Sequence, residues 1–230
     1  MTASPITSAP LDLRSRFLEQ LPAEDLRVIL GAATQRHLCA HSIVTNQGDT
    51  ARYFFLLRKG RGRFFYTTEG GQKLLLHWFA PGEIFGVMSL LPNPSTYLVS
   101  TEIVKDSLVL VWDRATMQDL ILRYPRLSMN ALSTAAEYLT LCIATHVTLT
   151  CHNARERLAE VLINLTRTIG QEVTGGVELD VTNEELATAA NITPFTTSRL
   201  LNEWRRNGAV VKTRGKILLR FPQRLFSRAA

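Results

Sequence analysis

The sequence predicts an α+β fold: an N-terminal β-roll of the double-stranded β-helix or jelly-roll type, a long helix, and a C-terminal winged helix-turn-helix. Three observations indicate this order. Short β-type runs separated by turn signals fill residues 37–112, residues 127–152 contain no Gly or Pro, and two capped helical segments precede a basic hairpin. We expect four parts: a helical arm (1–34), the β-roll (35–124), the long helix (125–153) and the winged helix-turn-helix (154–230).

The composition is that of an ordinary globular chain. Of 230 residues, 46% are hydrophobic and 20% are charged, which argues against disorder. The longest apolar runs fall far short of the roughly 20 residues that a bilayer crossing needs. The N-terminus has no apolar segment behind a basic start, so it does not predict a secretory signal. We therefore expect a cytoplasmic protein with no membrane partner.

The three cysteines indicate reduced thiols. Cys39, Cys142 and Cys151 are odd in number, far apart and without a C-x-x-C pair. This spacing argues against a disulfide framework, a zinc ribbon or a cysteine-ligated iron–sulfur cluster.

The first third of the chain changes from helical to β-type patterning. Leu13, Phe17 and Leu21 follow a helical stripe, and Pro22 begins a second helix. Turn signals such as Lys59-Gly60 then separate short runs with the length and spacing of an all-β roll. These runs are Tyr53–Leu57, Arg63–Thr67, Lys73–Phe79 and Ser107–Trp112.

The long helical segment carries a 3-4 repeat of the kind that forms a seam for another helix. One heptad position holds Met129, Ala136, Ile143 and Thr150, and the other holds Leu132, Leu139 and His146. We prefer a self-pairing homodimer, and packing of this helix against the chain's own β-roll is the alternative. We expect a hinge at Asn153 or Ala154 before a further helix, and a loop over residues 170–176.

The richest motif lies between residues 182 and 221. Thr182 caps a helix, and Glu185 three residues later completes a capping box. After a tight connection, Thr193 caps a second helix with Pro194 at its first position, and Gly208 ends it. A β-hairpin follows, so the pattern is two short helices and a basic wing.

The second helix of this motif has two different faces. Thr197, Leu200, Leu201 and Trp204 follow the i, i+3, i+4, i+7 spacing of an inward face. From Arg199 to the C-terminus, nine basic residues stand against one acid, Glu203, which favours a polyanionic partner. Together with the two capped helices and the wing, this charge predicts double-stranded DNA as the partner. The candidate DNA contacts are Thr193, Phe195, Thr196, Ser198, Arg199, Asn202, Arg206, Arg214 and Lys216.

These residues resemble the Crp/Fnr family of bacterial transcription regulators. The resemblance rests on Ser198-Arg199-Leu200-Leu201 and the Gly215-Lys216 wing, and on Gln47-Gly48-Asp49 and Pro81-Gly82-Glu83-Ile84-Phe85-Gly86 in the β-roll. It covers almost the whole chain. It implies a homodimer with a cyclic-nucleotide-type sensor domain, which reads a two-fold symmetric site with half-sites about one helical turn apart and contacts RNA polymerase.

The resemblance transfers DNA-reading roles unevenly. Arg199 matches the family's guanine-reading arginine, and Ser198 matches the serine that often precedes it. Phe195 stands where many members have a base-reading glutamate, so it either presses on thymine methyl groups or braces the helix N-terminus. Thr193 and Thr196 are expected to position the helix on phosphates.

The sensor departs from the family's cyclic AMP binders. Val87 replaces the glutamate that fixes the ribose, Thr96-Tyr97 stands near the Arg-Ser pair for the phosphate, and Cys142-Ile143 replaces the Thr-Ser pair that meets the purine. A phosphate buried without a paired cation is costly, so we expect no cyclic AMP. The remaining pocket would hold an apolar or flat aromatic ligand, or be filled as core. Its expected residues are Phe85, Gly86, Val87, Met88, Leu90, Leu91, Thr96, Tyr97, Cys142 and Ile143.

Two histidine arrangements raise cofactor hypotheses. Haem would need an axial ligand, for which His146, His77 and the sulfur of Cys142 are candidates, although a histidine on a helix seam is more often a packed residue. His37 and Cys39 alternate with His41 in a metal-like spacing. The resemblance places position 41 at a turn, which favours a surface turn over a metal site.

Two alternatives stay open. One is a constitutive DNA-binding regulator whose sensor domain is vestigial. The other, more remote, is a cupin-like metalloenzyme, which would need a close His-x-His pair and a carboxylate converging inside the barrel. The chain shows neither this arrangement nor a Ser/His/Asp set, so we expect that it is not an enzyme.

Overall fold

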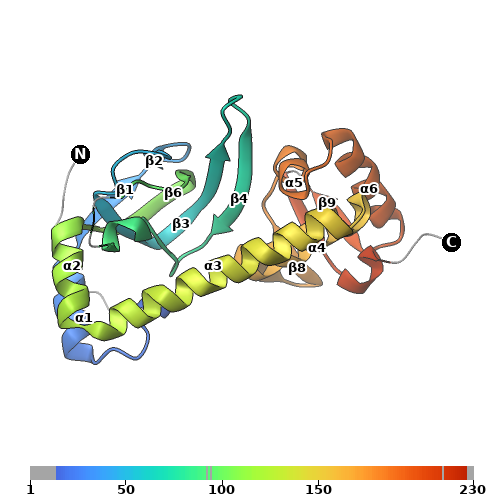
Figure 1. The fold of residues 1–230 in the computed structure, drawn as a ribbon. Helices are drawn as coiled ribbons and strands as arrows, with labels where there is room; N and C mark the ends of the chain where they lie inside the picture. Colours follow the sequence, from blue (N-terminus) through green and yellow to red (C-terminus); the bar gives the residue numbers. More distant parts are fainter. Residues whose placement is uncertain (1–13, 92, 94, 214, 227–230) are drawn as a thin grey trace. The chain divides into compact units, whose positions relative to one another are not determined.

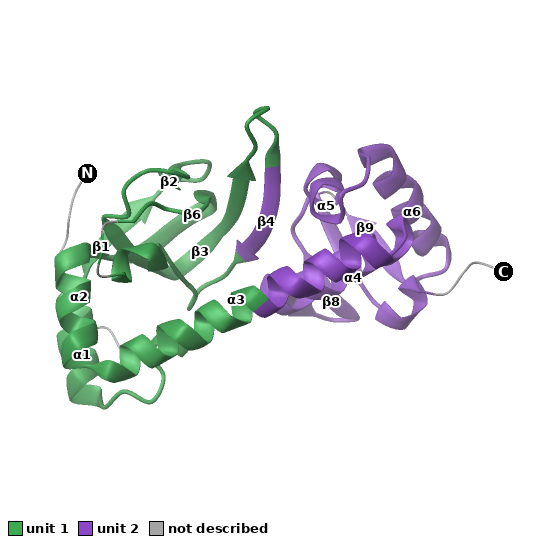
Figure 2. Cartoon of the chain, in the orientation of Figure 1, with its two compact units in different colours: residues 1–73, 79–139 green, residues 74–78, 140–230 purple. Residues whose placement is uncertain are grey.

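The computed structural model describes residues 14–91, 93, 95–213 and 215–226, and it confirms the α+β fold (Figure 1). The chain divides into two compact units (Figure 2). Unit 1 comprises the described residues of Met1–Lys73 and Phe79–Leu139, and unit 2 comprises those of Leu74–Trp78 and Thr140–Ala230. No helix in the described part of the chain has both the length and the apolar character needed to cross a membrane.

The β-roll and its flanking helices occupy most of the N-terminal half. The elements in order are η1 (Arg16–Leu18), α1 (Ala23–Gly31), β1 (Thr34–Leu38), β2 (Ile43–Thr45), β3 (Tyr53–Thr67), β4 (Lys73–Phe79), β5 (Ile84–Phe85), η2 (Val87–Leu90), β6 (Ser100–Asp113) and α2 (Arg114–Arg123). The sheet order is β1-β6-β3-β4, with β2 also paired to β6 and β5 to β3. The expected helical arm is present as η1 and α1, and its residues 1–13 lie outside the described residues.

Strand β3 corrects one expectation. Lys59-Gly60 was predicted to separate two strands, but β3 runs through it and pairs with β6 over most of its length. The register shifts around Lys59 and Arg61, and Gly60 adopts φ +104° there. A Cβ at Gly60 would lie 2.0 Å from Ser107 Oγ, so this position admits only glycine. The glycine therefore marks a bulge in a long strand and not a turn.

Unit 1 has two hydrophobic clusters. The first packs η1, α1, α2 and the start of the long helix against one side of the sheet, around Phe54 and Trp112, which are almost fully buried. The indole nitrogen of Trp112 donates to the carbonyl of Ile29 at 2.8 Å, so α1 is fixed to β6. The second cluster fills the interior of the roll and is dominated by phenylalanine.

Helix α3 (Pro125–Cys151) is the long helix of the prediction and passes from unit 1 into unit 2 (Figure 2). Its first turns are anchored, because Asn130 Nδ2 donates to the carbonyls of Phe17 and Glu19 at 2.9 and 3.0 Å. From Met129 onward, the helix also exposes apolar residues. Their exposed fractions are 57% for Met129, 63% for Leu132, 63% for Leu139 and 58% for Ile143.

The C-terminal part of unit 2 is a helical domain with a small sheet. Its elements are α4 (Ala154–Thr168), β7 (Gln171–Val173), β8 (Gly176–Leu179), α5 (Asn183–Ala190), α6 (Pro194–Arg206), β9 (Val210–Thr213), β10 (Lys216–Leu219) and η3 (Pro222–Leu225), and the sheet order is β7-β8-β10-β9. The loop expected over residues 170–176 is instead mostly a hairpin. Its second strand gains a partner in β10, and Gly175 and Gly176 supply the positive φ angles of its turn.

One hydrophobic cluster holds unit 2 together. Leu158 and Leu162 of α4 pack with Leu186 of α5 and with Leu201 and Trp204 of α6, and all five are buried. Asn153, one of the two residues expected to form a hinge, caps α4 with a capping box. Because α5 and α6 share this core, the outer face of α6 is held in a fixed orientation relative to α5.

Candidate nucleic-acid interface and effector site

The turn between α5 and α6 is built from caps that the sequence predicted. The side chain of Thr182 accepts from the backbone of Glu185, and the Glu185 carboxylate reaches back to the Thr182 N–H at 2.8 Å. Asn191 ends α5 with φ +49°, the left-handed conformation that asparagine tolerates. Thr193 then caps α6 by accepting from the Thr196 N–H at 3.1 Å, with Pro194 at the first helical position.

The two faces of α6 are as predicted. Thr197, Leu200, Leu201 and Trp204 are all buried. On the opposite side, Arg199, Asn202 and Arg206 are exposed, as is Phe195 with 78% of its surface accessible. The helix therefore presents two guanidinium groups, an amide and a phenyl ring to solvent, which matches the groups that read base edges in a major groove.

Ser198 is placed differently from its neighbours on this face. It is half-buried, and its Oγ accepts a hydrogen bond from Asn183 Nδ2 at 2.8 Å. Lys212 Nζ in turn donates to Asn183 Oδ1 at 3.0 Å. This chain of contacts links the start of α5, the middle of α6 and strand β9. Sequence reasoning missed Asn183 and Lys212, because no local spacing relates residues on three separate elements.

The wing carries one predicted contact inside the described residues. Lys216 Nζ forms an ion pair with Glu178 at 2.5 Å, and this hydrogen bond, followed by the negative charge of Glu178, raises the pKa of Lys216. Lys216 is therefore charged and tethered to β8. Arg214, the other predicted contact of the wing, lies outside the described residues.

The interior of the β-roll is filled by stacked aromatic rings. Phe85, a predicted pocket residue, stacks on Phe55 with ring centroids 4.5 Å apart and an angle of 3° between the planes. The ring centroid of Phe79 lies 5.1 Å from that of Phe85 and 4.6 Å from that of Phe64. Phe55, Phe79 and Phe85 are at most 4% exposed. These rings occupy the space between β3, β4 and β5 as core.

The other predicted pocket residues of unit 1 are also engaged. The Tyr97 hydroxyl accepts from the Tyr53 N–H at 3.0 Å and donates to the Tyr53 carbonyl at 3.1 Å, and burial raises the pKa of Tyr97. Gly86 adopts φ +76°, and a Cβ there would lie 2.5 Å from the Tyr53 carbonyl oxygen. Val87 packs against the first cluster, and Met88 is half-buried.

Residues Leu90, Leu91 and Thr96 form the remainder of this stretch. Leu90 is partly buried against the first cluster, whereas Leu91 and Thr96 are exposed. A threonine at the surface offers no cation for a buried phosphate. This stretch thus keeps a left-handed turn at Gly86, while Val87 and Thr96 carry no charge.

Tyr138 of α3 reaches the aromatic interior, which sequence reasoning did not anticipate. Its hydroxyl donates to Glu83 Oε1 at 3.5 Å, and its ring meets Phe64 edge-on with centroids 6.0 Å apart. Burial, followed by the charge of Glu83, raises the pKa of Tyr138 well above its usual range. The helical position of Tyr138 gave no signal, because it lies off the heptad seam.

The residues proposed for haem or metal binding are spread along the surface. Cys142 and His146 are exposed on α3, as is the predicted pocket residue Ile143, and His77 lies half-buried on β4. His41 adopts φ +66° in a turn, so it leaves the face that a continuous strand would share with His37 and Cys39. Among the described residues, no group of three or more His, Cys, Asp or Glu side chains is placed to hold a metal.

Comparison with known proteins agrees with this geometry. Residues 35–124 match the cyclic nucleotide-binding domain family, and residues 156–227 match the Crp-like helix-turn-helix domain family. The cyclic AMP receptor protein of Thermus thermophilus is 32% identical over 164 residues, covering 71% of this chain and 73% of that protein. The anaerobic regulatory protein of Bacillus subtilis is 23% identical over 212 residues, which cover 91% of this chain and 89% of that protein.

Solved structures show the same fold. The c-di-GMP responsive global regulator CLP of Xanthomonas campestris superposes with a TM-score of 0.74 at 18% identity, covering 86% of this chain and 99% of that one. The two family matches and the 32% identical relative define a DNA-binding transcription regulator and not an enzyme. The chain belongs to the Crp/Fnr family.

Proposed function

We propose that the protein is a homodimeric, sequence-specific DNA-binding regulator that reads a two-fold symmetric site. The observation that carries the proposal is the outer face of α6, where Arg199, Asn202 and Arg206 are exposed around a helix whose other side is locked in the core. Arginine can make a bidentate contact to guanine in the major groove. The capped start of α6, with Thr193 and Thr196, would contact a phosphate of the DNA backbone.

The dimer would form along α3. Met129, Leu132, Leu139 and Ile143 each expose more than half of their surface, which is costly for a helix in water. They occupy the two heptad positions of the predicted seam, so a second copy of the helix would bury them. The two copies of α6 would then meet half-sites about one helical turn apart. Contact with RNA polymerase belongs to the same proposal.

Selection from random-sequence DNA tests the proposal directly. The expected outcome is an inverted repeat whose half-sites are separated by about 10 base pairs, centre to centre. Recovery of no symmetric sequence would contradict it. Transcription in vitro from a promoter that carries the selected site then tests the contact with RNA polymerase.

The oligomeric state is tested by light scattering. Leu139→Glu places a charge in the seam and is expected to yield monomers with greatly reduced affinity for the symmetric site. Leu122→Glu is the matched control, because Leu122 is 79% exposed on α2 and lies outside the seam. A dimer that persists in Leu139→Glu would contradict the role of α3.

We also propose that cyclic AMP is not the effector, although a relative is named for it. Val87 and Thr96 offer neither a carboxylate nor a cation, and the Tyr97 hydroxyl is already bound to the backbone of Tyr53. Isothermal titration with cyclic AMP is expected to show no heat of binding, and the affinity for the selected DNA should not change. Saturable binding would overturn this part of the proposal.

A second candidate function is a constitutive regulator with a vestigial sensor. The stacked rings of Phe55, Phe79 and Phe85 favour it, because they fill space between β3, β4 and β5 that a ligand would need. The expected result is full affinity for the selected site in protein from which small molecules have been removed by denaturation and refolding. Haem through His146 stays a weaker hypothesis, and an absorption band that is lost in His146→Ala would support it.

A further inference from the structure

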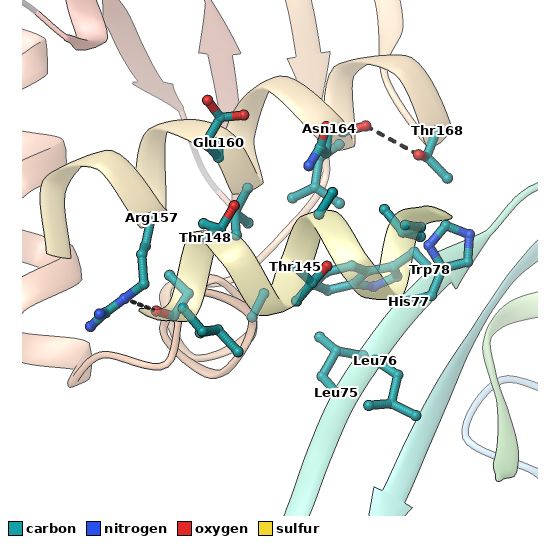
Figure 3. A pocket seen from close by; sticks show the side chains of 17 residues that line it. Leu75, Leu76, His77, Trp78, Thr145, Thr148, Arg157, Glu160, Asn164 and Thr168 are labelled. Atoms are coloured by element: carbon teal, nitrogen blue, oxygen red, sulfur yellow. Dashed lines mark hydrogen bonds between the residues drawn. The ribbon is translucent and has the colours of Figure 1, made fainter. Parts of the chain in front are cut away.

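Unit 2 contains a pocket of about 220 Å³ (Figure 3). Its walls come from β4, from the last turns of α3, from α4 and from the end of α5, and α6 contributes none of its lining residues. Trp78 and Leu165 of the wall are 4% exposed, and Ala190 is 1% exposed. The rim includes Leu76 and Leu149, which are 48% and 38% exposed. The site is thus a pocket with a buried floor and an open mouth.

Trp78 is the unusual member of the floor. Its indole Nε1 is buried and has no hydrogen-bond partner among the described residues. The other two tryptophans differ, since Trp112 donates to the Ile29 carbonyl at 2.8 Å and Trp204 donates to the Leu225 carbonyl at 3.0 Å. A buried donor left without an acceptor is destabilising, so this group favours an occupant that carries an acceptor.

The charges around the pocket restrict the occupant further. The Arg157 guanidinium is already used, because it donates to the carbonyls of Ala190 at 2.9 Å and of His152 and Asn191 at 3.2 Å. Glu160 also lines the pocket, and it would repel an anion. The body of the pocket is apolar, with Leu75, Val161 and Leu165 among its walls. An uncharged, largely apolar molecule fits this environment better than an anion.

We propose that this pocket binds a small, uncharged, planar aromatic molecule whose ring acceptor accepts a hydrogen bond from Trp78 Nε1. An apolar cavity of about 150 Å³ holds benzene, and the larger volume here suits a bicyclic ring. Thr148 and Asn164, which also line the pocket, are available to polar substituents near the mouth (Figure 3).

The pocket adjoins the DNA-reading domain through α5. Ala189 and Ala190 belong to α5 and line the pocket, and Ala190 also packs in the core that contains Leu200 and Leu201 of α6. A ligand that prefers one position of α5 would therefore change the affinity of α6 for DNA. This second step rests on the proposed function, whereas the binding step does not.

Quinoline and naphthalene are matched probes, since they share one shape and only quinoline has a ring acceptor. The full-length protein is titrated with each while the three indole N–H resonances are followed by NMR and assigned with single Trp→Phe variants. Quinoline is expected to shift the Trp78 resonance saturably and leave those of Trp112 and Trp204 in place. It should bind about 2- to 10-fold more tightly than naphthalene, the worth of one hydrogen bond.

Two variants complete the test. In Trp78→Phe the preference for quinoline over naphthalene should disappear. Ala144→Leu adds bulk at the exposed rim without touching the floor and should weaken both probes, whereas Ala115→Leu, at an exposed position of unit 1, should weaken neither. An unchanged Trp78 resonance at millimolar quinoline, or equal shifts of all three indoles, would overturn the proposal.

The effect on DNA is measured separately with the selected site. A change in affinity on adding quinoline, absent in Ala144→Leu, supports coupling through α5. Binding of quinoline with unchanged DNA affinity would refute the coupling and leave the pocket assigned. A protein that binds quinoline but no symmetric DNA would refute the proposed function and not the pocket.

Discussion

The interior of the β-roll and the outer face of α6 use their side chains in opposite ways. In the roll, two of the predicted pocket residues are buried: Phe85 stacks on Phe55, and the Tyr97 hydroxyl is hydrogen-bonded to the backbone of Tyr53. On α6, Phe195 and Arg199 point outward into solvent. Aromatic side chains are thus buried in the core of the roll, whereas α6 exposes one to solvent.

The difference indicates where this chain can meet a partner. An aromatic side chain gains about 1.5–3 kcal/mol from full burial, so a phenylalanine that is 78% exposed at a helix N-terminus leaves that gain for a partner to supply. The phenylalanine rings inside the roll are already buried, so a partner could supply no further burial to them. We therefore expect substitutions in the roll to change stability and substitutions on α6 to change recognition.

The largest expected effect is that of Phe85→Ala. Removing a buried ring from the stack should lower the free energy of unfolding of unit 1 by about 3–5 kcal/mol, since a cavity replaces its contacts. Denaturant unfolding followed by circular dichroism measures this. Tyr66→Ala is the control, because Tyr66 is 42% exposed on the same sheet. It should lower the free energy of unfolding far less than Phe85→Ala. A small loss in Phe85→Ala would mean that the interior is loosely packed and open to a ligand.

Arg199→Ala is expected to act on recognition alone. Affinity for the selected site should fall by about 1–3 kcal/mol, and base choice should relax at one position of each half-site. Arg205→Ala is the matched control, since it removes the same charge from an exposed position of α6 that is not among the candidate base contacts. Its loss should be equal on specific and random DNA. The same equal loss for Arg199→Ala, measured by fluorescence anisotropy, would contradict a base-reading role.

The caps explain why α5 and α6 could be predicted from the sequence. Thr182, Glu185, Thr193 and Pro194 act within one turn of their own helix, so their spacing along the chain determines the contact. The two faces of α6 follow from the same local periodicity. These parts of the site needed no information about distant residues.

Other parts depend on contacts between distant elements. Gly60 has the local signature of a turn, yet pairing with β6 carries β3 through it as a bulge. The contacts that join Asn183 to Ser198 and Lys212 connect three elements, and that of Tyr138 with Glu83 joins α3 to the turn before β5. No periodicity in the sequence encodes such pairs, because tertiary packing creates them.

Phe195 allows a sharper test of the contrast, because its exposure favours a contact with thymine over a bracing role. Replacing one thymine of each half-site by uracil removes only the C5-methyl group. This change should weaken the binding free energy of the native protein for DNA by about 0.8 kcal/mol per half-site, the contribution of one buried carbon. The Phe195→Ala variant should not distinguish the two DNAs. If both proteins lose equal affinity, the phenyl ring does not touch the methyl group.

We expect the smallest effect from Lys216, because its charge is partly neutralised by an ion pair between Lys216 Nζ and Glu178 Oε1 at 2.5 Å. Lys216→Ala should weaken specific and random DNA alike, and the slope of log affinity against log salt should fall by about 1 if the lysine meets a phosphate. Glu178→Gln sharpens the comparison, because it breaks the ion pair of Lys216 and removes a negative charge from β8 beside the wing. This variant should bind all DNA more tightly than the native protein. If Glu178→Gln leaves the affinity and the salt slope unchanged, Lys216 stabilises the wing through its ion pair and does not contact DNA.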